Sequence, residues 1–375
     1  MDIRLILLAA GGAATVTPSA QAGEEKKGVT PYMLVFADSA WFDGSARPGG
    51  EDSARDVTLA EIGLKFETRA IKGRLAYDFS GDGQWQDAAL SHASGDFTFE
   101  IGQFKEPASL DKLTPPGDTL FLETARFTKA FGIGRRLGVA VRYSNDFLSL
   151  SGAVTSGSLD DEPESGFGVG QTAFSARLTA TPIRSDLTVH FGAYARTLDY
   201  DGHGAVFGGT PGTVLAGKSH YVKLDVLKGP EAERSHLAGL EAALSRGPLF
   251  VSAEYARLDV ETPAGDGVLS GGYVQASLAL TGETRPYSPG YGAFQAISPA
   301  RPVSEGGPGA VELSLRADQL DFSEFAAGRT TAVTAGVTWT PADNVRVMVN
   351  RTEEFHDGTG RSDGSSWAFR VQASF

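Results

Sequence analysis

The chain has 375 residues, of which 47 are glycine and 22 are phenylalanine, while methionine occurs 3 times and cysteine not at all. The lack of cysteine excludes a disulfide scaffold, a zinc–thiolate site and a cytosolic redox enzyme that works through thiols. The formal net charge of −13 argues against a general nucleic-acid binder, which needs a basic face. Abundant glycine and aromatic residues with little methionine favour many short strands joined by turns.

Residues 1–22 have the features of a secretory signal peptide. Arg4 lies in a short n-region, an apolar stretch follows it, and Ala20-Gln21-Ala22 matches an A-x-A cleavage site. We therefore expect an exported mature chain that begins near Gly23, with residues 23–375 forming one barrel domain. Beyond the signal, no window approaches the roughly 18 apolar residues that a membrane-spanning helix needs.

The rest of the chain alternates between apolar and polar residues. The clearest case is residues 367–375, where the odd positions are apolar or aromatic and the intervening positions include Arg370 and Gln372. Similar alternation covers 311–318, 333–340 and 345–350. A period of two residues predicts β-strands with one apolar and one polar face.

Three features distinguish a transmembrane barrel from a soluble sandwich. The predicted strands have about ten residues, whereas soluble strands average about five or six. The polar face carries charges in mid-strand, and aromatic residues occur near strand ends. The aromatic residues are Tyr77, Phe79, Tyr143, Tyr194, Tyr255, Trp339, Trp367 and Phe375. This pattern is typical of an all-β, antiparallel transmembrane β-barrel with an apolar outer face and aromatic girdles.

The alternating segments number about sixteen, an even number, as expected for a bacterial barrel with a water-filled lumen. We expect strands at about 31–42, 57–67, 71–80, 84–92, 96–104, 136–144, 147–156, 170–181, 186–199, 234–246, 248–260, 269–282, 309–322, 331–341, 344–354 and 366–375. Short turns alternate with long extracellular loops, of which the third, 105–135, is expected to fold inward. Two segments fit poorly: 283–308 is long yet falls on the turn side, and the strand-like 219–227 is placed within an outer loop.

Two blocks of sequence resemble the phosphate-selective porin O and P family. The first block comprises Ile101–Pro107, Ser109, Leu110, Leu113, Phe121, Glu123 and Gly134–Val139. The second comprises Tyr273–Ser277, Leu280–Tyr287, Arg301, Pro302, Gly306, Gly307, Gly309, Ala310, Glu312, Leu313, Thr338, Trp339 and Asn344–Arg346. The resemblance implies a trimeric, sixteen-stranded porin of the bacterial outer membrane, whose lumen is lined by arginines and lysines that pass phosphate or polyphosphate.

The predicted lumen departs from a strongly basic pattern, because acids and bases nearly balance. The bases are Lys65, Arg74, Arg142, Arg177, Arg196, Arg316, Arg346 and Arg370. The acids are Glu61, Asp78, Glu100, Glu241, Glu254, Glu312 and Asp318. The resemblance therefore indicates a porin more firmly than it indicates phosphate selectivity.

Loop 105–135 and the lumen wall supply the candidate pore and anion-binding residues, because rings of arginine or lysine are the usual anion filter. The candidates are Lys105, Arg126, Lys129, Arg135, Arg136, Arg142, Arg177, Arg316 and Arg346. The alternative is that these charges pair with carboxylates, so that they pin the loop and hold the barrel round.

We predict a channel for passive diffusion of small hydrophilic solutes, in particular anions such as phosphate. The alternatives are a general, sugar- or carboxylate-permeable porin, or a structural or enzymatic barrel. The six histidines form no helical metal pair and no G-x-S-x-G motif occurs, so we expect no catalysis, cofactor or metal. The expected partners are outer-membrane lipid, two further copies in a homotrimer, and the insertion machinery, which would read the C-terminal Phe375.

Overall fold

The computed structural model describes residues 28–44, 46–160, 170–200, 207–209, 213–216, 222–224, 232–263 and 265–375. The predicted signal peptide lies outside these ranges. The described residues contain no helix that is long and apolar enough to cross a membrane.

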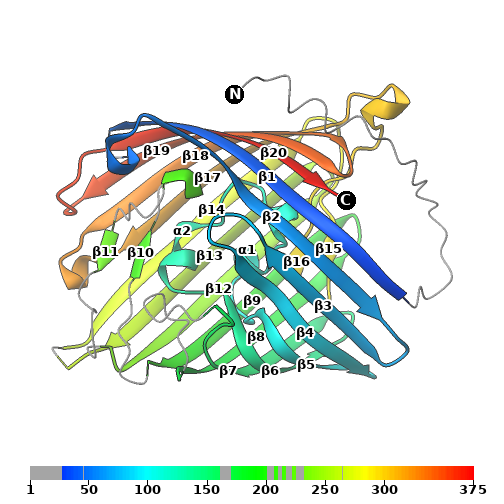
Figure 1. Cartoon of the computed structure of the whole chain (residues 1–375), viewed down its shortest axis with the longest axis horizontal. Coiled ribbons are helices and arrows are strands. Elements are labelled where there is room, and N and C mark those ends of the chain that lie inside the picture. Colours follow the sequence, from blue (N-terminus) through cyan, green and yellow to red (C-terminus); the bar gives the residue numbers. More distant parts are fainter. Residues whose placement is uncertain are drawn as a thin grey trace.

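Sixteen antiparallel strands close into one barrel (Figure 1), which confirms the predicted architecture. The first eight are β1 (Gly28–Gly44), β2 (Ser53–Glu67), β3 (Ile71–Asp78), β4 (Gln84–Ser94), β5 (Phe97–Lys105), β6 (Arg135–Ser144), β7 (Leu148–Thr155) and β8 (Thr172–Arg184). The other eight are β9 (Leu187–Asp199), β12 (Arg234–Arg246), β13 (Leu249–Glu261), β14 (Gly267–Ala279), β17 (Ala310–Asp321), β18 (Arg329–Ala342), β19 (Val345–Asp357) and β20 (Gly364–Ser374).

The barrel closes where β1 meets β20. The two strands pair from Leu34 with Ser374 to Gly44 with Gly364. Beyond the last paired strand residue, the Phe375 N–H donates to the Met33 carbonyl at 2.9 Å, and the Met33 N–H donates back at 3.0 Å. Closure leaves no strand edge unpaired, which is the condition for a sheet to stand in lipid.

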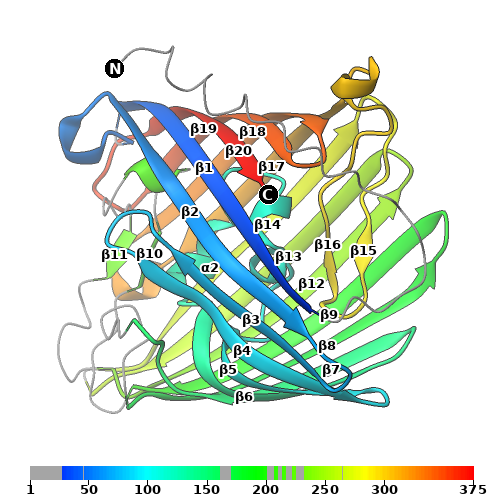
Figure 2. The same ribbon diagram turned by 45° about the vertical axis from the view of Figure 1, so that its right-hand side comes forward.

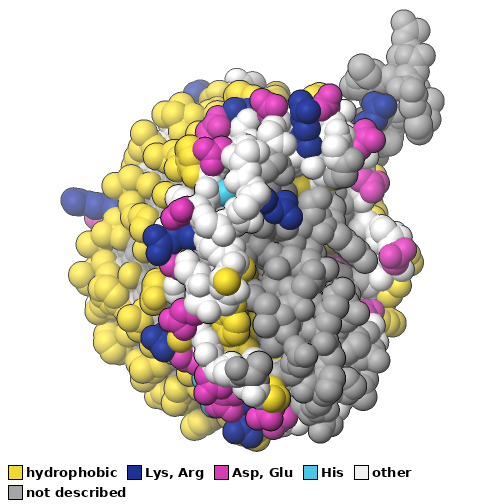
Figure 3. Space-filling view, turned by 90° about the vertical axis from the view of Figure 1, so that its left-hand side faces the viewer, with side chains coloured by type: hydrophobic (Ala, Val, Ile, Leu, Met, Phe, Trp, Pro, Cys, Tyr) yellow, Lys and Arg dark blue, Asp and Glu magenta, His cyan; other side chains and the backbone are white. Residues whose placement is uncertain are grey.

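The alternation of the sequence separates two faces. Large apolar side chains such as Phe174, Leu240 and Val274 are exposed on the outer wall, and Trp339 and Trp367 lie there near strand ends. Figure 3, which looks toward the end that carries β10 and β11, shows hydrophobic side chains along the visible wall and charged ones gathered at the rim. The outer surface is therefore that of a barrel surrounded by lipid.

One aromatic residue predicted for the girdle lies inside the barrel instead. Tyr194 is 4% exposed and belongs to the lumen cluster, because it shares the strand parity of the inward-facing Arg196. Its ring covers Gly239 on β12, where a Cβ atom would come within 2.1 Å of that ring. The prediction for Tyr194 was wrong because proximity to a strand end was given more weight than alternation.

The connections differ in length between the two ends of the barrel. The segment 280–309 is the long connection on the turn side, and it contains β15 (Tyr287–Ser288), β16 (Ala293–Phe294) and the 3₁₀ turn η7 (Val303–Glu305) (Figure 2). At the other end, β10 (Phe207–Gly209) pairs with β11 (Val222–Leu224) within the connection between β9 and β12, together with η5 (Val214–Ala216). The strand-like part of 219–227 therefore belongs to an outer loop, as predicted.

The remaining helical elements are short. The third outer loop carries α1 (Leu110–Leu113), η3 (Pro116–Asp118) and α2 (Arg126–Ala130). Two further 3₁₀ turns, η2 (Pro48–Gly50) and η8 (Ser323–Phe325), lie in outer loops.

Candidate functional site: the constricted lumen

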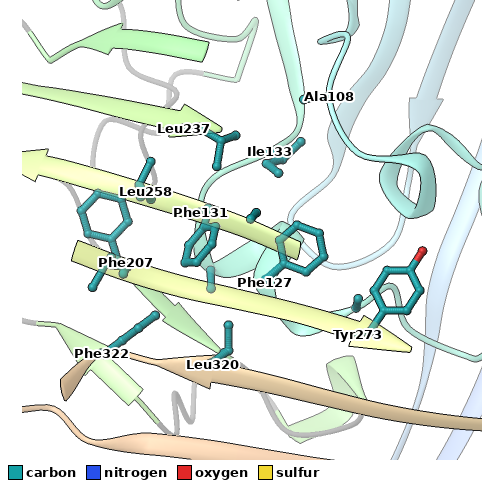
Figure 4. Close-up of a cluster of buried hydrophobic side chains, with 14 of the residues drawn as sticks. Ala108, Phe127, Phe131, Ile133, Phe207, Leu237, Leu258, Tyr273, Leu320 and Phe322 are labelled. Atoms are coloured by element: carbon teal, nitrogen blue, oxygen red, sulfur yellow. The ribbon is translucent and has the colours of Figure 1, made fainter. Parts of the chain in front are cut away.

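The third outer loop, residues 106–134 and hereafter L3, folds into the barrel as predicted. Its α2 side presents Phe127, Phe131 and Ile133, each at most 1% exposed, to an apolar cluster on the opposite wall (Figure 4). That wall contributes Leu237 from β12, Leu258 from β13, Tyr273 from β14 and Leu320 from β17. Burial of these side chains is the main apolar term that draws the loop inward.

The apolar cluster occupies one side of the lumen only. Its described members come from β1, β8, β9, β12, β13, β14, β17, β19, β20 and the loops, and none comes from β3 to β7. The wall of β3 to β7 is therefore the part of the lumen that this cluster leaves free, and the space along it is called the passage below.

Buried arginines attach L3 to the strands of the far wall. Arg126 donates to the Asp318 carboxylate and, at 3.1 Å, to the Thr330 hydroxyl. Arg346 donates to the carbonyls of Gly117 and Thr119 at 2.6 and 3.0 Å. Buried carbonyls need such partners, because an unpaired polar group away from water costs about 1–3 kcal/mol.

Two further wall arginines hold L3 in the same way. Arg316 donates to the Glu123 carbonyl at 3.0 Å, and its guanidinium lies 4.5 Å from the ring centroid of Phe121. Arg370 pairs with Asp38 at 2.7 Å and donates to the Leu122 carbonyl at 2.7 Å. L3 is thus bound to both β17 and β20.

The first part of L3 is held through buried carboxylates. Glu106 accepts from Arg196 at 2.9 Å and lies 3.6 Å from Arg136. Burial alone would raise the pKa of Glu106, but the positive charges of Arg196 and Arg136 outweigh burial and hold this pKa below its usual value. At the start of α1, Glu254 accepts from the N–H groups of Leu110 and Asp111 at 3.1 and 2.7 Å.

Segment 280–309 enters the lumen from the turn side. Arg285 pairs with Glu312 at 2.8 Å and donates to the Asp118 carbonyl of L3 at 3.1 Å. Arg177 on β8 pairs with Glu241 at 2.5 Å and donates to the carbonyls of Tyr291 and Gly292 at 2.9 and 2.8 Å.

L3 and segment 280–309 also pack against each other. Phe294 of the segment shares a buried cluster with Leu110, Leu120 and Phe121 of L3 and with Phe250 of β13. The constriction is therefore built from both ends of the barrel.

The free wall and the facing side of L3 carry more bases than acids. The bases are Arg74, Lys105, Lys112, Lys129, Arg135 and Arg142, and the acids are Asp78, Asp87, Glu100 and Glu123. Arg74 bridges Asp87 and Glu100 at 3.5 and 3.1 Å. Nearer the outer end, Arg135 pairs with Asp87 at 3.0 Å, and Lys129 with Glu123 at 2.7 Å.

Three of the bases have no carboxylate contact among the described residues. The Lys105 ammonium donates to the carbonyls of Lys112 and Thr114 at 2.7 and 3.0 Å. The Arg142 Nε donates to the Ser151 hydroxyl at 3.2 Å. Burial, together with Lys129 and Arg135, lowers the pKa of Lys112 to about 8. The described carboxylates therefore leave part of the basic charge along the passage without an ion-pair partner.

The predicted candidates fall into two groups. Lys105, Lys129, Arg135 and Arg142 are partly exposed and lie on β5, β6 or L3. The other five are at most 5% exposed and contact carboxylates or carbonyls, which is the arrangement expected if these charges hold the loop and the barrel in place. These five are Arg126, Arg136, Arg177, Arg316 and Arg346.

Several residues of the constriction are absent from the predicted set of site residues. Lys112 and Arg74 belong to segments that the sequence did indicate, the third loop and the lumen wall. Arg285 and Tyr291 come from segment 280–309, whose sequence carries no signal for an inward path.

A closed, sixteen-stranded barrel with an apolar outer wall and a charged, constricted lumen defines a porin, a channel of the outer membrane. A family model described as "Phosphate-selective porin O and P" matches residues 53–372, and the chain therefore belongs to this family. Membership and barrel together indicate a channel rather than an enzyme.

Known relatives and solved structures agree with this fold. An uncharacterized protein of Caulobacter vibrioides is 31% identical over 321 residues, which cover 81% of this chain but 60% of that protein. Among solved structures, the trimer form of OmpT, an outer membrane protein of Vibrio cholerae, is 11% identical with a TM-score of 0.59, covering 93% of this chain and 99% of its own. An anion-selective porin from Comamonas acidovorans is 12% identical with a TM-score of 0.57, over the same shares of the two chains.

Proposed function

We propose that this porin lets small anions such as phosphate pass in preference to cations. The observation that carries the proposal is the passage along β3 to β7, where six bases face four acids and three of the bases have no carboxylate contact within the described chain. In a narrow, partly desolvated passage, such fixed charge raises the local concentration of anions and screening by salt is weak. The structurally similar porin from Comamonas acidovorans is described as anion-selective, which supports the proposed preference for anions.

The test is the reversal potential of the purified protein in planar bilayers under a potassium chloride gradient. The wild-type channel is expected to prefer chloride, despite the net charge of −13. Replacing Lys112, Lys129 and Arg135 together by Gln should shift the reversal potential toward cations. A cation-selective wild type, or an unchanged potential in the triple variant, would contradict the proposal.

The control variant removes the same amount of charge from the outer wall. Arg234, Arg257 and Arg351 are partly exposed there, and each has an acidic neighbour. Their joint replacement by Gln should leave the reversal potential unchanged, because they do not line the passage. If both triple variants shift it equally, net charge rather than the passage sets selectivity.

We further propose that the chain is exported with cleavage near Gly23 and assembles as a homotrimer. The A-x-A motif supports the cleavage, and the trimeric Vibrio cholerae structure supports the assembly. Mass spectrometry of the detergent-extracted native complex measures both the mass of the mature chain and the number of copies. A monomeric complex would contradict the assembly proposal.

A further inference from the structure

A pocket opens beneath L3, where three parts of the chain meet. It is lined by the wall strands β5, β6 and β7, by Arg177 of β8, by the start of L3, and by Tyr291 of segment 280–309. The polar lining residues include Thr98, Ser149 and Ser151.

The pocket carries hydrogen-bond donors that nearby acids do not contact. Lys105 and Arg142 both line it, and neither makes an ion pair with a described residue. Its acid, Glu100, is bridged to Arg74 at 3.1 Å. The guanidinium of Arg177 pairs with Glu241 and donates hydrogen bonds to two backbone carbonyls.

The donors left over suit one small anionic group. Lys105 already gives two hydrogens to carbonyls, so one remains. Arg142 uses its Nε on Ser151, and its two terminal nitrogens make no hydrogen bond to a described residue. A pair of adjacent guanidinium nitrogens matches the two oxygens of a carboxylate.

The rest of the lining is apolar. Leu113, Phe104 and Pro107 belong to it, and so does Tyr291, which is 47% exposed. The guanidinium carbons of Arg142 and Arg74 lie 5.5 and 5.9 Å from the centre of the Tyr291 ring, which keeps the ring at the pocket. A bare oxyanion would leave this apolar surface in contact with water, whereas a ligand with an apolar body would cover it.

We propose that this pocket is a subsite for organic monocarboxylates with an apolar body, the aromatic carboxylates above all. The carboxylate binds Arg142 and Lys105, and the ring lies between Leu113 and Tyr291. The inference rests on the proposed anion preference and adds to it a ligand class and a place in the lumen.

The experiment measures block of chloride current through the full-length channel by benzoate, acetate and phosphate, each as its sodium salt. Benzoate is expected to reach half-block at a concentration about tenfold lower than acetate, which has the same head group without the ring. It should also act at a lower concentration than phosphate. Equal block by the three anions, or strongest block by phosphate, overturns the proposal even if the channel is anion-selective.

Two variants separate the head-group and ring contacts. Arg142→Gln should raise the benzoate concentration for half-block by about tenfold or more, because a charge-assisted pair is lost. Leu113→Asn should weaken benzoate block and leave acetate block unchanged. If Arg142→Gln does not insert, the Leu113 variant and the wild-type series still decide the matter.

Arg351 offers a matched control, since its guanidinium also lies over an aromatic ring, that of Trp367 at 5.3 Å, but on the outer wall. Benzoate should block the Arg351→Gln channel at the same concentration as the wild-type channel. Equal weakening in the Arg351 and Arg142 variants would overturn the assignment to the pocket. The reversal potential, measured in the same bilayers, reports separately whether the underlying anion preference holds.

Discussion

Arginine and lysine have two distinct uses in this lumen. Arg126, Arg346 and Arg370 are buried. Arg126 of L3 donates to the barrel wall, and Arg346 and Arg370 of the wall donate to L3. Removing one partner of a buried ion pair leaves the other charge buried without a partner, which lowers stability by about 3–5 kcal/mol. Lys112, by contrast, has no ion-pair partner within the described structure, so its charge is available to a permeating ion.

The charge on Lys112 makes the anion preference depend on pH. Burial and the charges of Lys129 and Arg135 lower its pKa to about 8, while Asp111 and Glu123 act in the opposite sense. Lys112 is therefore charged below this pKa and neutral above it. We expect chloride preference to fall between about pH 7 and pH 9, measured as a shift of the reversal potential.

Two variants identify the titrating group. Lys112→Arg keeps its charge throughout this range, so its reversal potential should stay constant. Lys112→Gln should begin at the lower preference and also stay constant. A pH dependence that persists in both variants would assign the titration to another group.

At the scale of elements, L3 docks through an apolar face as well as through arginines. Phe131 is completely buried between the loop and the wall, and its ring stacks on Phe322 at 6.4 Å. Phe131→Ala would remove contacts worth about 3–5 kcal/mol in a typical core. We expect the loop to loosen, which raises the single-channel conductance and its noise.

The control is Phe174→Ala on β8, which truncates a ring that is 59% exposed on the outer wall. This variant should conduct as the wild type does. An unchanged conductance in Phe131→Ala, in channels that insert normally, would mean that the arginine contacts alone hold L3.

The predictability of these elements differs with their surroundings. The strands could be predicted, because lipid outside and water inside impose a period of two along every strand. Inward residues such as Arg142 and Arg316 followed from that period. Which of them bind L3 did not follow, because Arg316 meets the Glu123 carbonyl of a loop 193 residues away. The inward path of Tyr291 could not be predicted either, because its carbonyl accepts a hydrogen bond from Arg177 on a strand that is distant in the sequence.

At the scale of the whole molecule, the C-terminus completes the ladder between the first and last strands. Phe375 is 69% exposed to the outside, and its backbone exchanges two hydrogen bonds with Met33. Deleting Phe375 removes both bonds and the terminal aromatic residue. We expect less inserted barrel in outer-membrane fractions, while the amount of exported chain stays the same.

Phe375→Tyr preserves the ring and the backbone bonds, so it should insert as the wild type does. If the deletion variant also inserts normally, the terminal residue carries no information for the insertion machinery.

The long reach of the arginines that hold L3 also dictates when the channel narrows during folding. The contacts of Arg126 with Asp318, Arg346 with Gly117 and Arg370 with Leu122 span 192, 229 and 248 residues. Contacts so distant in sequence form late, because a long loop must first be closed. L3 precedes these three anchors in the chain, and all three lie on the last four strands of the barrel. The loop can therefore reach its complete set of contacts only when these strands are in place, so the full narrowing of the pore requires the closed wall.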